Sequence, residues 1–231
     1  MPLFDPEEEV LKSRRNLPHW KQDSKTYFIT FRLADSLPIS KRMQLKDDRE
    51  AWKTRFGNSV SAVLNAGERA EYFRLFHQRV EQWLDAEEGQ YLLKRGEVAE
   101  VVEKALHHFD GTRYLLGRFV VAANHVHVLV TPTAGEDISR ILHSWKSFTA
   151  KEINRILNRA GIVWLDENFD HLVRSVPQLE KFEDDIQSHD GGLIGGRSFT
   201  DESPADSSHR QDACATSKSR PVVPASSQND V

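Results

Sequence analysis

The chain has 231 residues, of which 39% are hydrophobic and 29% are charged, and its formal net charge is −4. This composition is typical of a globular domain, and the small negative charge excludes a polycation that binds nucleic acid through its overall charge. The single cysteine, Cys214, excludes a disulfide framework, and no apolar run approaches the roughly 18 residues of a membrane span. The acidic start MPLFDPEEEV has no apolar signal core, so we expect a cytoplasmic protein.

Hydrophobic periodicity predicts strands and helices along most of the chain. In order, we expect a strand at 26–34, helices at 40–56, 67–88 and 96–110, strands at 114–123 and 125–133, a helix at 137–159, a strand, turn and return at 163–175, and a helix at 176–188. Asp137 is the predicted N-cap of the long helix, and Pro177 stands in the first turn of the last one.

Without the charged segment 36–90, this order is βαββαβ followed by a helix. It predicts an α+β fold, a ferredoxin-like antiparallel sheet with helices on one face, in which 36–90 is a helical insertion after the first strand. From residue 189 to 231, serine, glycine and proline supply 15 of 43 residues, and no periodicity remains. We therefore expect a folded domain at 14–188 and a disordered, low-complexity tail at 189–231.

Two histidines flank a single valine in the predicted strand NHVHVLVTP. Residues i and i+2 of a strand share a face, so His125 and His127 are expected side by side, with Val126 and Val128 facing a core. Two neutral imidazoles on one face can share a divalent ion. The spacing alone is equally consistent with two hydrogen-bonded histidines on a half-exposed strand, so both interpretations stay open.

One face of the predicted helix 137–159 combines cations and hydroxyl groups, which suits contact with DNA phosphates. Its members, three or four residues apart, are Arg140, Ser144, Ser147, Lys151 and Arg155, and Lys146 adds a further cation on the same helix. The alternative is a charged face that is merely solvated.

Four stretches of the chain resemble the REP-associated tyrosine transposases, which belong to the single-tyrosine HUH transposases of bacterial insertion sequences. They are LPHWKQDSKTYFITFRLADSLP, NHVHVLVTP, ILHSWKSFTAKEIN and VWLDENFDHLVRS, and the resemblance spans about residues 14–182. It implies a ferredoxin-like HUH sheet, single-stranded or hairpin DNA as substrate, and Mg²⁺ or Mn²⁺ held by His125 and His127. It further implies a tyrosine on the last helix that forms a 5′-phosphotyrosine, and a polar residue one turn later that completes the metal site.

The last predicted helix departs from that family's pattern. Asp185 occupies the tyrosine position, His189 occupies the position of the later polar residue, and no tyrosine follows Tyr114. A change of reading frame near residue 183 would explain this and would leave a binding scaffold without strand transfer. Alternatively, Asp185 and His189, spaced i and i+4, are genuine replacements that form a three-histidine, one-aspartate metal site with His125 and His127.

Three hypotheses of function follow. The leading one is a transposase-like protein that binds single-stranded or hairpin DNA and performs metal-assisted strand cleavage and transfer, or is catalytically defective because the tyrosine is missing. The second is a module that binds DNA hairpins without cutting them, and the third is a metal-dependent nuclease that uses water. Asp185 is expected to be a poor nucleophile, because the acyl phosphate it would form hydrolyses readily. We expect DNA as the partner of a monomer or homodimer.

Overall fold

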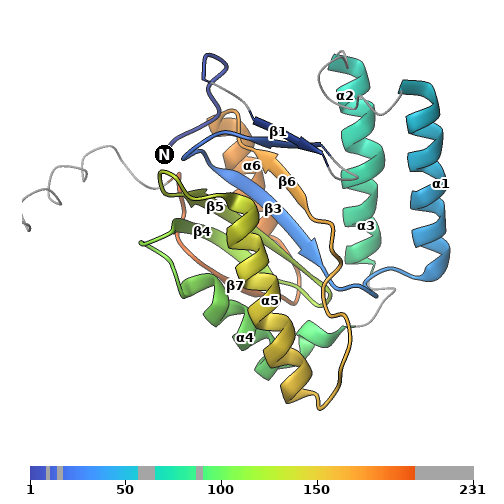
Figure 1. The fold of residues 1–231 in the computed structure, drawn as a ribbon, viewed down its shortest axis with the longest axis vertical. Coiled ribbons are helices and arrows are strands. Elements are labelled where there is room, and N and C mark those ends of the chain that lie inside the picture. Colours follow the sequence, from blue (N-terminus) through green and yellow to red (C-terminus); the bar gives the residue numbers. More distant parts are fainter. Residues whose placement is uncertain (9–10, 15–17, 57–65, 87–90, 201–231) are drawn as a thin grey trace, which may run out of the picture. The chain divides into compact units, whose positions relative to one another are not determined.

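A computed structural model of the chain describes residues 1–8, 11–14, 18–56, 66–86 and 91–200. Its centre is a five-stranded antiparallel sheet with the order β6-β3-β5-β4-β7 (Figure 1). The strands are β3 (Tyr27–Arg32), β4 (Tyr114–Val121), β5 (His125–Pro132), β6 (Phe169–Leu172) and β7 (Leu193–Gly195). The predicted α+β class with an antiparallel sheet is confirmed. The sequence did not predict the separate hairpin of β1 (Leu11–Arg14) and β2 (Pro18–Lys21).

The central strand β5 is buried along its whole length. Because side chains alternate across a strand, Val126 and Val128 join one apolar cluster, whereas Leu129 joins the cluster on the other face together with β3 residue Phe28. His125 and His127 share the face of Leu129. Their strand is therefore covered on both sides, and the half-exposed strand considered from the sequence is not what forms.

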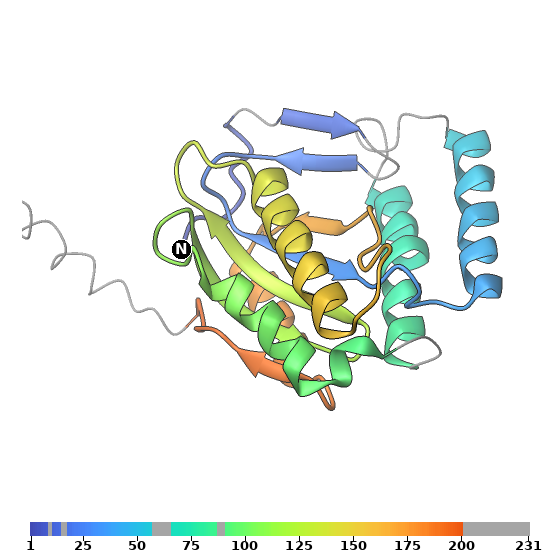
Figure 2. The ribbon, with the colours of Figure 1, turned by 60° about the horizontal axis from the view of Figure 1, so that its bottom comes forward.

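Helices α4 (Gly96–His107) and α5 (Ile138–Ile156) pack together across the valine-bearing face (Figure 2). The indole of Trp145 donates a hydrogen bond of 2.9 Å to the hydroxyl of Tyr114, which in turn donates to the carbonyl of Leu106. At the start of α5, Asp137 accepts from the backbone N–H of Ser139, which confirms the predicted N-cap. No described helix, α5 included, is long and apolar enough to cross a membrane.

The opposite face is covered in part by α6 (Val176–Gln187), although helices were predicted on one face only. The rings of Phe28 and Phe182 stack at 4.1 Å between centroids, and Leu129 and Ile186 extend this second apolar cluster. Ser175 caps α6 by accepting from the N–H of Gln178, and proline stands in the first turn, as predicted.

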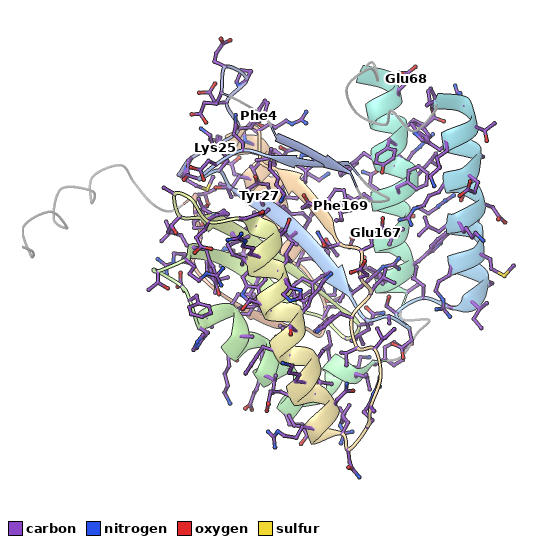
Figure 3. The ribbon with its side chains drawn as sticks, viewed as in Figure 1. Phe4, Lys25, Tyr27, Glu68, Glu167 and Phe169 are labelled. Carbon is purple, nitrogen blue, oxygen red and sulfur yellow. The ribbon has the colours of Figure 1, made fainter. Side chains whose placement is uncertain are left out.

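The predicted insertion after the first strand is confirmed as helical where the structure describes it, with 57–65 and 87–90 outside the described residues. It comprises α1 (Ile39–Phe56), α2 (Ala66–Phe73), a π-helical turn (Arg74–Gln78) and α3 (Arg79–Asp85). Its helices share a small core of their own around Trp52 and Phe76. The insertion stands beside the β6 edge, where Arg49 pairs with Glu167 at 2.8 Å and Phe73 packs edge-on against Phe169 (Figure 3).

The chain that follows α6 folds back onto the sheet. Strand β7 pairs with β4, and Phe199 is buried against the second apolar cluster. The buried carboxylate of Glu183 accepts hydrogen bonds from the Ser198 hydroxyl, the Phe199 N–H and the Thr200 hydroxyl, at 2.6–2.8 Å. The predicted start of the tail at residue 189 is therefore wrong, because the folded part continues to residue 200. Residues 201–231 lie outside the described residues.

A candidate metal centre on one face of the sheet

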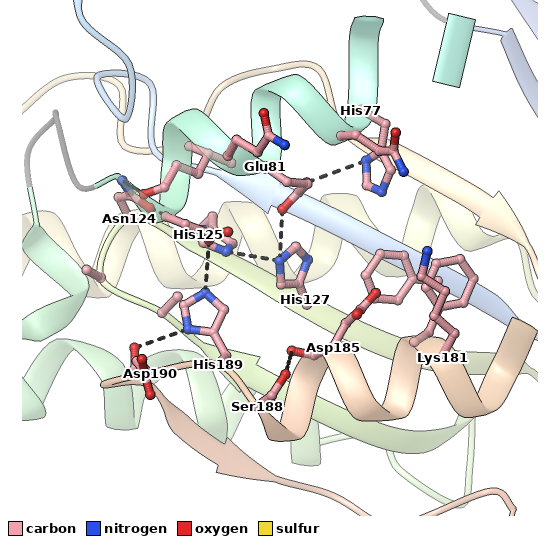
Figure 4. A pocket seen from close by; sticks show the side chains of 18 of the residues that line it. His77, Glu81, Asn124, His125, His127, Lys181, Asp185, Ser188, His189 and Asp190 are labelled. Atoms are coloured by element: carbon pink, nitrogen blue, oxygen red, sulfur yellow. Dashed lines mark hydrogen bonds and ion pairs between the residues drawn. The ribbon is translucent and has the colours of Figure 1, made fainter. Parts of the chain in front are cut away.

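A pocket of about 720 Å³ opens on the face of the sheet that carries the histidine pair (Figure 4). It is lined by β5 and the turn before it, by Phe28 of β3, by the insertion from Phe73 of α2 to Asp85 of α3, and by α6 with the residues that follow. The lining side chains that can bind a proton or a cation are His77, Glu81, Asp85, His125, His127, Lys181, Asp185, His189 and Asp190. The predicted placement of His125 and His127 on one face is confirmed.

His125 presents an unprotonated Nε2 to the pocket. Its Nδ1 lies 2.8 Å from Oδ1 of Asn124, whose amide is oriented because its Nδ2 donates to the carbonyl of Leu84. An amide oxygen only accepts, so we assign the proton to Nδ1 and a lone pair to Nε2. Burial, reinforced by the neighbouring His127, holds the pKa of His125 well below its usual value, so the ring is neutral.

His127 stands next to it, with the two Nε2 atoms 3.0 Å apart. Nδ1 of His127 lies 2.8 Å from the hydroxyl of Thr30 on the paired strand β3, and its ring stacks on Phe28. A hydroxyl can donate or accept, so Thr30 supports either tautomer of His127. Nε2 of His127 can therefore carry a proton, or offer a lone pair to a metal ion.

The insertion contributes Glu81 to this group. Its Oε2 lies 3.0 Å from Nε2 of His127, its Oε1 lies 3.5 Å from Nδ1 of His77, and 19% of the side chain is exposed. Burial alone would raise the pKa of Glu81, but the charge and hydrogen bond of His127 outweigh it and lower the pKa below its usual value. Glu81 is therefore an ionised carboxylate within the pocket.

The third histidine comes from the end of α6. The ring of His189 lies 5.1 Å from that of His125 and 6.1 Å from that of His127, between centroids. Donor atoms of the three histidines all lie within 4.8 Å of one another. Asp85 lies 3.4 Å from Nε2 of His189 and raises the pKa of this ring, so a proton and a metal ion compete for it.

Asp185 lines the same pocket from an exposed position on α6, and burial raises the pKa of its carboxyl group. It does not belong to the group of donor atoms formed by the three histidines. Of the three-histidine, one-aspartate set considered from the sequence, the structure thus brings the histidines together but not the aspartate. Two other carboxylates contact these histidines instead, Glu81 at His127 and Asp85 at His189, although neither belongs to that group of donor atoms.

None of the residues that line the pocket is a tyrosine. Tyr27 and Tyr114 are buried in the cluster on the opposite face of the sheet, and Tyr72 packs against Trp52 within the insertion. Tyr91 precedes α4. The structure therefore places no phenol at this site among the described residues.

His125 and His127 fit a divalent metal ion, and a donor atom of His189 lies within 4.8 Å of theirs. Two ligands at right angles around an ion at about 2.1 Å are separated by about 3.0 Å, which matches the distance of 3.0 Å between the Nε2 atoms of His125 and His127. Their Nδ1 atoms are engaged by Asn124 and Thr30, as metal-bound histidines usually are. Imidazole ligands suit first-row transition ions such as Mn²⁺, whereas Mg²⁺ prefers oxygen.

The residues predicted to contact DNA belong to α5 and so lie across the sheet from this pocket. Lys146 and Ser147 line a second pocket of about 730 Å³, which runs between α5 and the segment 161–170. The ammonium group of Lys146 donates to the carbonyls of Leu165 and Asp166, and Arg155 pairs with Glu152. The remaining predicted residues, Arg140, Ser144 and Lys151, have no role that the structure identifies.

Sequence reasoning missed the partners that orient the histidines and the acid that contacts them. Thr30 lies far from the histidine motif in the sequence, whereas Asn124 stands next to it. No spacing rule marks either residue. Glu81 had a weak signal, because it stands between the apolar residues Val80 and Leu84 on a helix whose inner face is otherwise apolar.

Residues 183–200 fit the fold closely. Gly196 has φ of +83°, and a Cβ there would lie 2.0 Å from the carbonyl oxygen of Gly117, so no other residue fits without a shift. Together with the hydrogen bonds to Glu183, this matching shows that residues 183–200 pack as part of the sheet domain.

No family model matches the chain, and no curated protein matches it. Among solved structures, one that is similar is described as a REP-associated tyrosine transposase bound to a REP hairpin. It is 13% identical, the alignment covers 76% of this chain and 70% of that chain, and the TM-score is 0.40. A likeness of this size is consistent at most with a distant relationship and establishes neither a family nor an activity.

Proposed function

We propose that the protein binds single-stranded or hairpin DNA and that a divalent metal ion at His125, His127 and His189 assists the cleavage of a phosphodiester bond. The observation that carries this proposal is the meeting of three imidazoles in an open pocket, two of them oriented through Nδ1 by Asn124 and Thr30. Imidazoles that are oriented through Nδ1 by hydrogen bonds are suited to an ion rather than to packing.

DNA as the substrate is supported by the sequence motifs and by α5. The chain is acidic overall, so phosphate contacts require a local cationic surface, and Arg140, Lys151 and Arg155 supply one on the exposed side of α5. Leu165 and Asn168 line both the pocket along α5 and a small cavity next to Glu81. A DNA strand that leaves α5 would therefore cross the segment that contains Leu165 and Asn168 to reach the histidines.

When bound, an ion at this position polarises the scissile phosphate and lowers the pKa of a coordinated water. His125 and His127 would hold that ion through their Nε2 atoms. Water is the proposed nucleophile, because no tyrosine lines the pocket. Asp185, whose pKa is raised, is one of the exposed carboxylates of the pocket, with Asp85 and Asp190, and would accept the proton of this water. The reaction then ends in free DNA ends and does not preserve the bond for rejoining.

The test uses end-labelled hairpin and single-stranded DNA with Mn²⁺, with Mg²⁺ and with EDTA. We expect cleaved ends that require the metal, and no covalent adduct on a denaturing gel. His125→Ala and His127→Ala should abolish cleavage and leave DNA binding intact, whereas His108→Ala, an exposed histidine next to α4, should change neither. A shifted but uncut band under every condition would indicate a binding module, and an adduct on a tyrosine would indicate a complete transposase; either result would refute this mechanism.

A further inference from the structure

We propose that Glu81 is a direct ligand of the same ion, so that the helical insertion completes the centre. The set then comprises three imidazoles and one carboxylate, and it favours a first-row transition ion over Mg²⁺. This inference rests on the proposed metal centre and adds to it a ligand from a segment outside the sheet.

The contacts around Nε2 of His127 carry the argument. This atom lies 3.0 Å from Nε2 of His125 and 3.0 Å from Oε2 of Glu81. Nε2 of His125 bears a lone pair, because Asn124 holds the proton on the other nitrogen, and a carboxylate oxygen bears lone pairs only. A proton on Nε2 of His127 can be donated to only one of these two acceptors. The other acceptor then has no donor from His127. A metal ion between the three atoms satisfies all of them.

The distances agree with shared coordination. Ligand atoms in adjacent positions of an octahedron with bonds of about 2.1 Å are separated by about 3.0 Å. Both distances to His127 have this value, one within β5 and one between β5 and α3. The agreement of two independent distances around one atom is the geometry expected when Nε2 of His127 has a neighbouring ligand in each of two adjacent positions.

The insertion holds Glu81 in place for this role. The π-helical turn before α3 carries His77, whose Nδ1 lies 3.5 Å from the second oxygen of Glu81. The ring of His77 stacks on Phe169 of β6 at 3.8 Å between centroids. One turn after Glu81, Asp85 reaches His189. Helix α3 therefore contacts two of the three histidines, and π-helical turns are frequent at functional sites.

The chemistry of the ligands also determines which ion is expected. Mg²⁺ prefers oxygen ligands and keeps several of its waters, whereas imidazole nitrogens favour Mn²⁺, Zn²⁺ and Co²⁺. Three imidazoles with one carboxylate should therefore bind these ions in the presence of a large excess of Mg²⁺.

The experiment measures binding of Mn²⁺ to the DNA-free full chain by electron paramagnetic resonance, and the visible spectrum of bound Co²⁺. Glu81→Gln, which keeps the size of the side chain, should weaken Mn²⁺ binding at least about 10–100-fold and change the Co²⁺ spectrum. Glu97→Gln, the same substitution at an exposed position in the first turn of α4, should change neither. Excess Mg²⁺ should not displace Mn²⁺ from the wild-type chain.

Circular dichroism of the metal-free variants checks that they fold. If Glu81→Gln does not fold, Glu81→Asp keeps the charge and shortens the reach, and it should weaken Mn²⁺ binding and alter the Co²⁺ spectrum. A folded Glu81→Gln or Glu81→Asp variant with unchanged affinity and spectrum would overturn this inference. The proposed function would survive that result if His125→Ala still abolished metal binding. Failure of the wild-type chain to bind any of these ions would overturn both.

Discussion

The face of the sheet under α4 and α5 is closed by apolar side chains, whereas the opposite face holds a pocket with histidines and a carboxylate. The same strand supplies both, because β5 directs its valines to one face and His125 and His127 to the other. Burying imidazoles and a carboxylate costs free energy unless each has a partner. The comparison indicates that the first face supplies most of the stability, which allows the second to hold polar groups arranged for binding.

The largest expected effect is on the apolar face. Trp145→Ala should lower the free energy of unfolding by about 3–5 kcal/mol, because it leaves a cavity and removes the indole that donates to the Tyr114 hydroxyl. Urea unfolding measures this. Phe148→Ala, on the same helix but at a residue that is 52% exposed, should stay within about 0.5 kcal/mol of the wild type. Metal affinity per folded molecule should not change in either variant, and a change would show that the two faces are coupled.

The next effect concerns the segment that supports α6. Gly196→Ala should destabilise the protein by about 2–5 kcal/mol, because it combines a positive φ with overlap on the Gly117 carbonyl. Gly191→Ala is the matched control, since its φ is +75° but no atom lies within 4 Å of the added Cβ, and it should cost about 1–2 kcal/mol. Thermal unfolding and limited proteolysis report both. Equal losses of stability in Gly196→Ala and Gly191→Ala would argue against the close approach of β7 and β4.

A smaller effect, dependent on pH, tests the site-bearing face away from the proposed ligands. Burial, aided by Arg174 and His77, lowers the pKa of His171 to about 4 from 6.5. The unfolded chain therefore binds a proton that the folded chain does not between these values, so stability falls as pH decreases from about 6.5 to about 4, by up to about 1.4 kcal/mol per pH unit. In His171→Gln this part of the slope should disappear.

Urea unfolding of wild type and His171→Gln at several pH values gives the difference between their free energies of unfolding. The contributions of other titrating groups cancel in this difference. An unchanged slope would mean that His171 titrates normally. The orientation of the Gln178 amide, which accepts from the Arg174 N–H, directs its Nε2 to donate to His171 and supports the neutral ring.

The smallest effect is expected on the outer surface of α5. Replacing Lys151 and Arg155 by alanine should weaken DNA binding and flatten its salt dependence by up to about one unit of log–log slope per lost phosphate contact. Lys104→Ala, an exposed lysine on the neighbouring helix α4, is the control. Binding titrations over a series of salt concentrations measure this, and an identical slope in the double variant would remove α5 from the DNA surface.

The sequence by itself determined the elements and one feature of the site. The alternation of β5 placed His125 and His127 together, and Asp137 marked the start of α5, because strand pleating and helix capping are local properties. The helical insertion was likewise visible as periodicity in a charged segment.

Only the tertiary structure decided what meets these histidines. Glu81 reaches His127 from a helix about 45 residues earlier in the chain, and the orientation of His125 depends on the bond from Asn124 to Leu84 in the insertion. The region after residue 188 lacks periodicity, yet residues 193–199 find a place on the sheet through Glu183 and the glycines that allow close approach. Such contacts follow from packing between distant segments, which periodicity and local propensity do not encode.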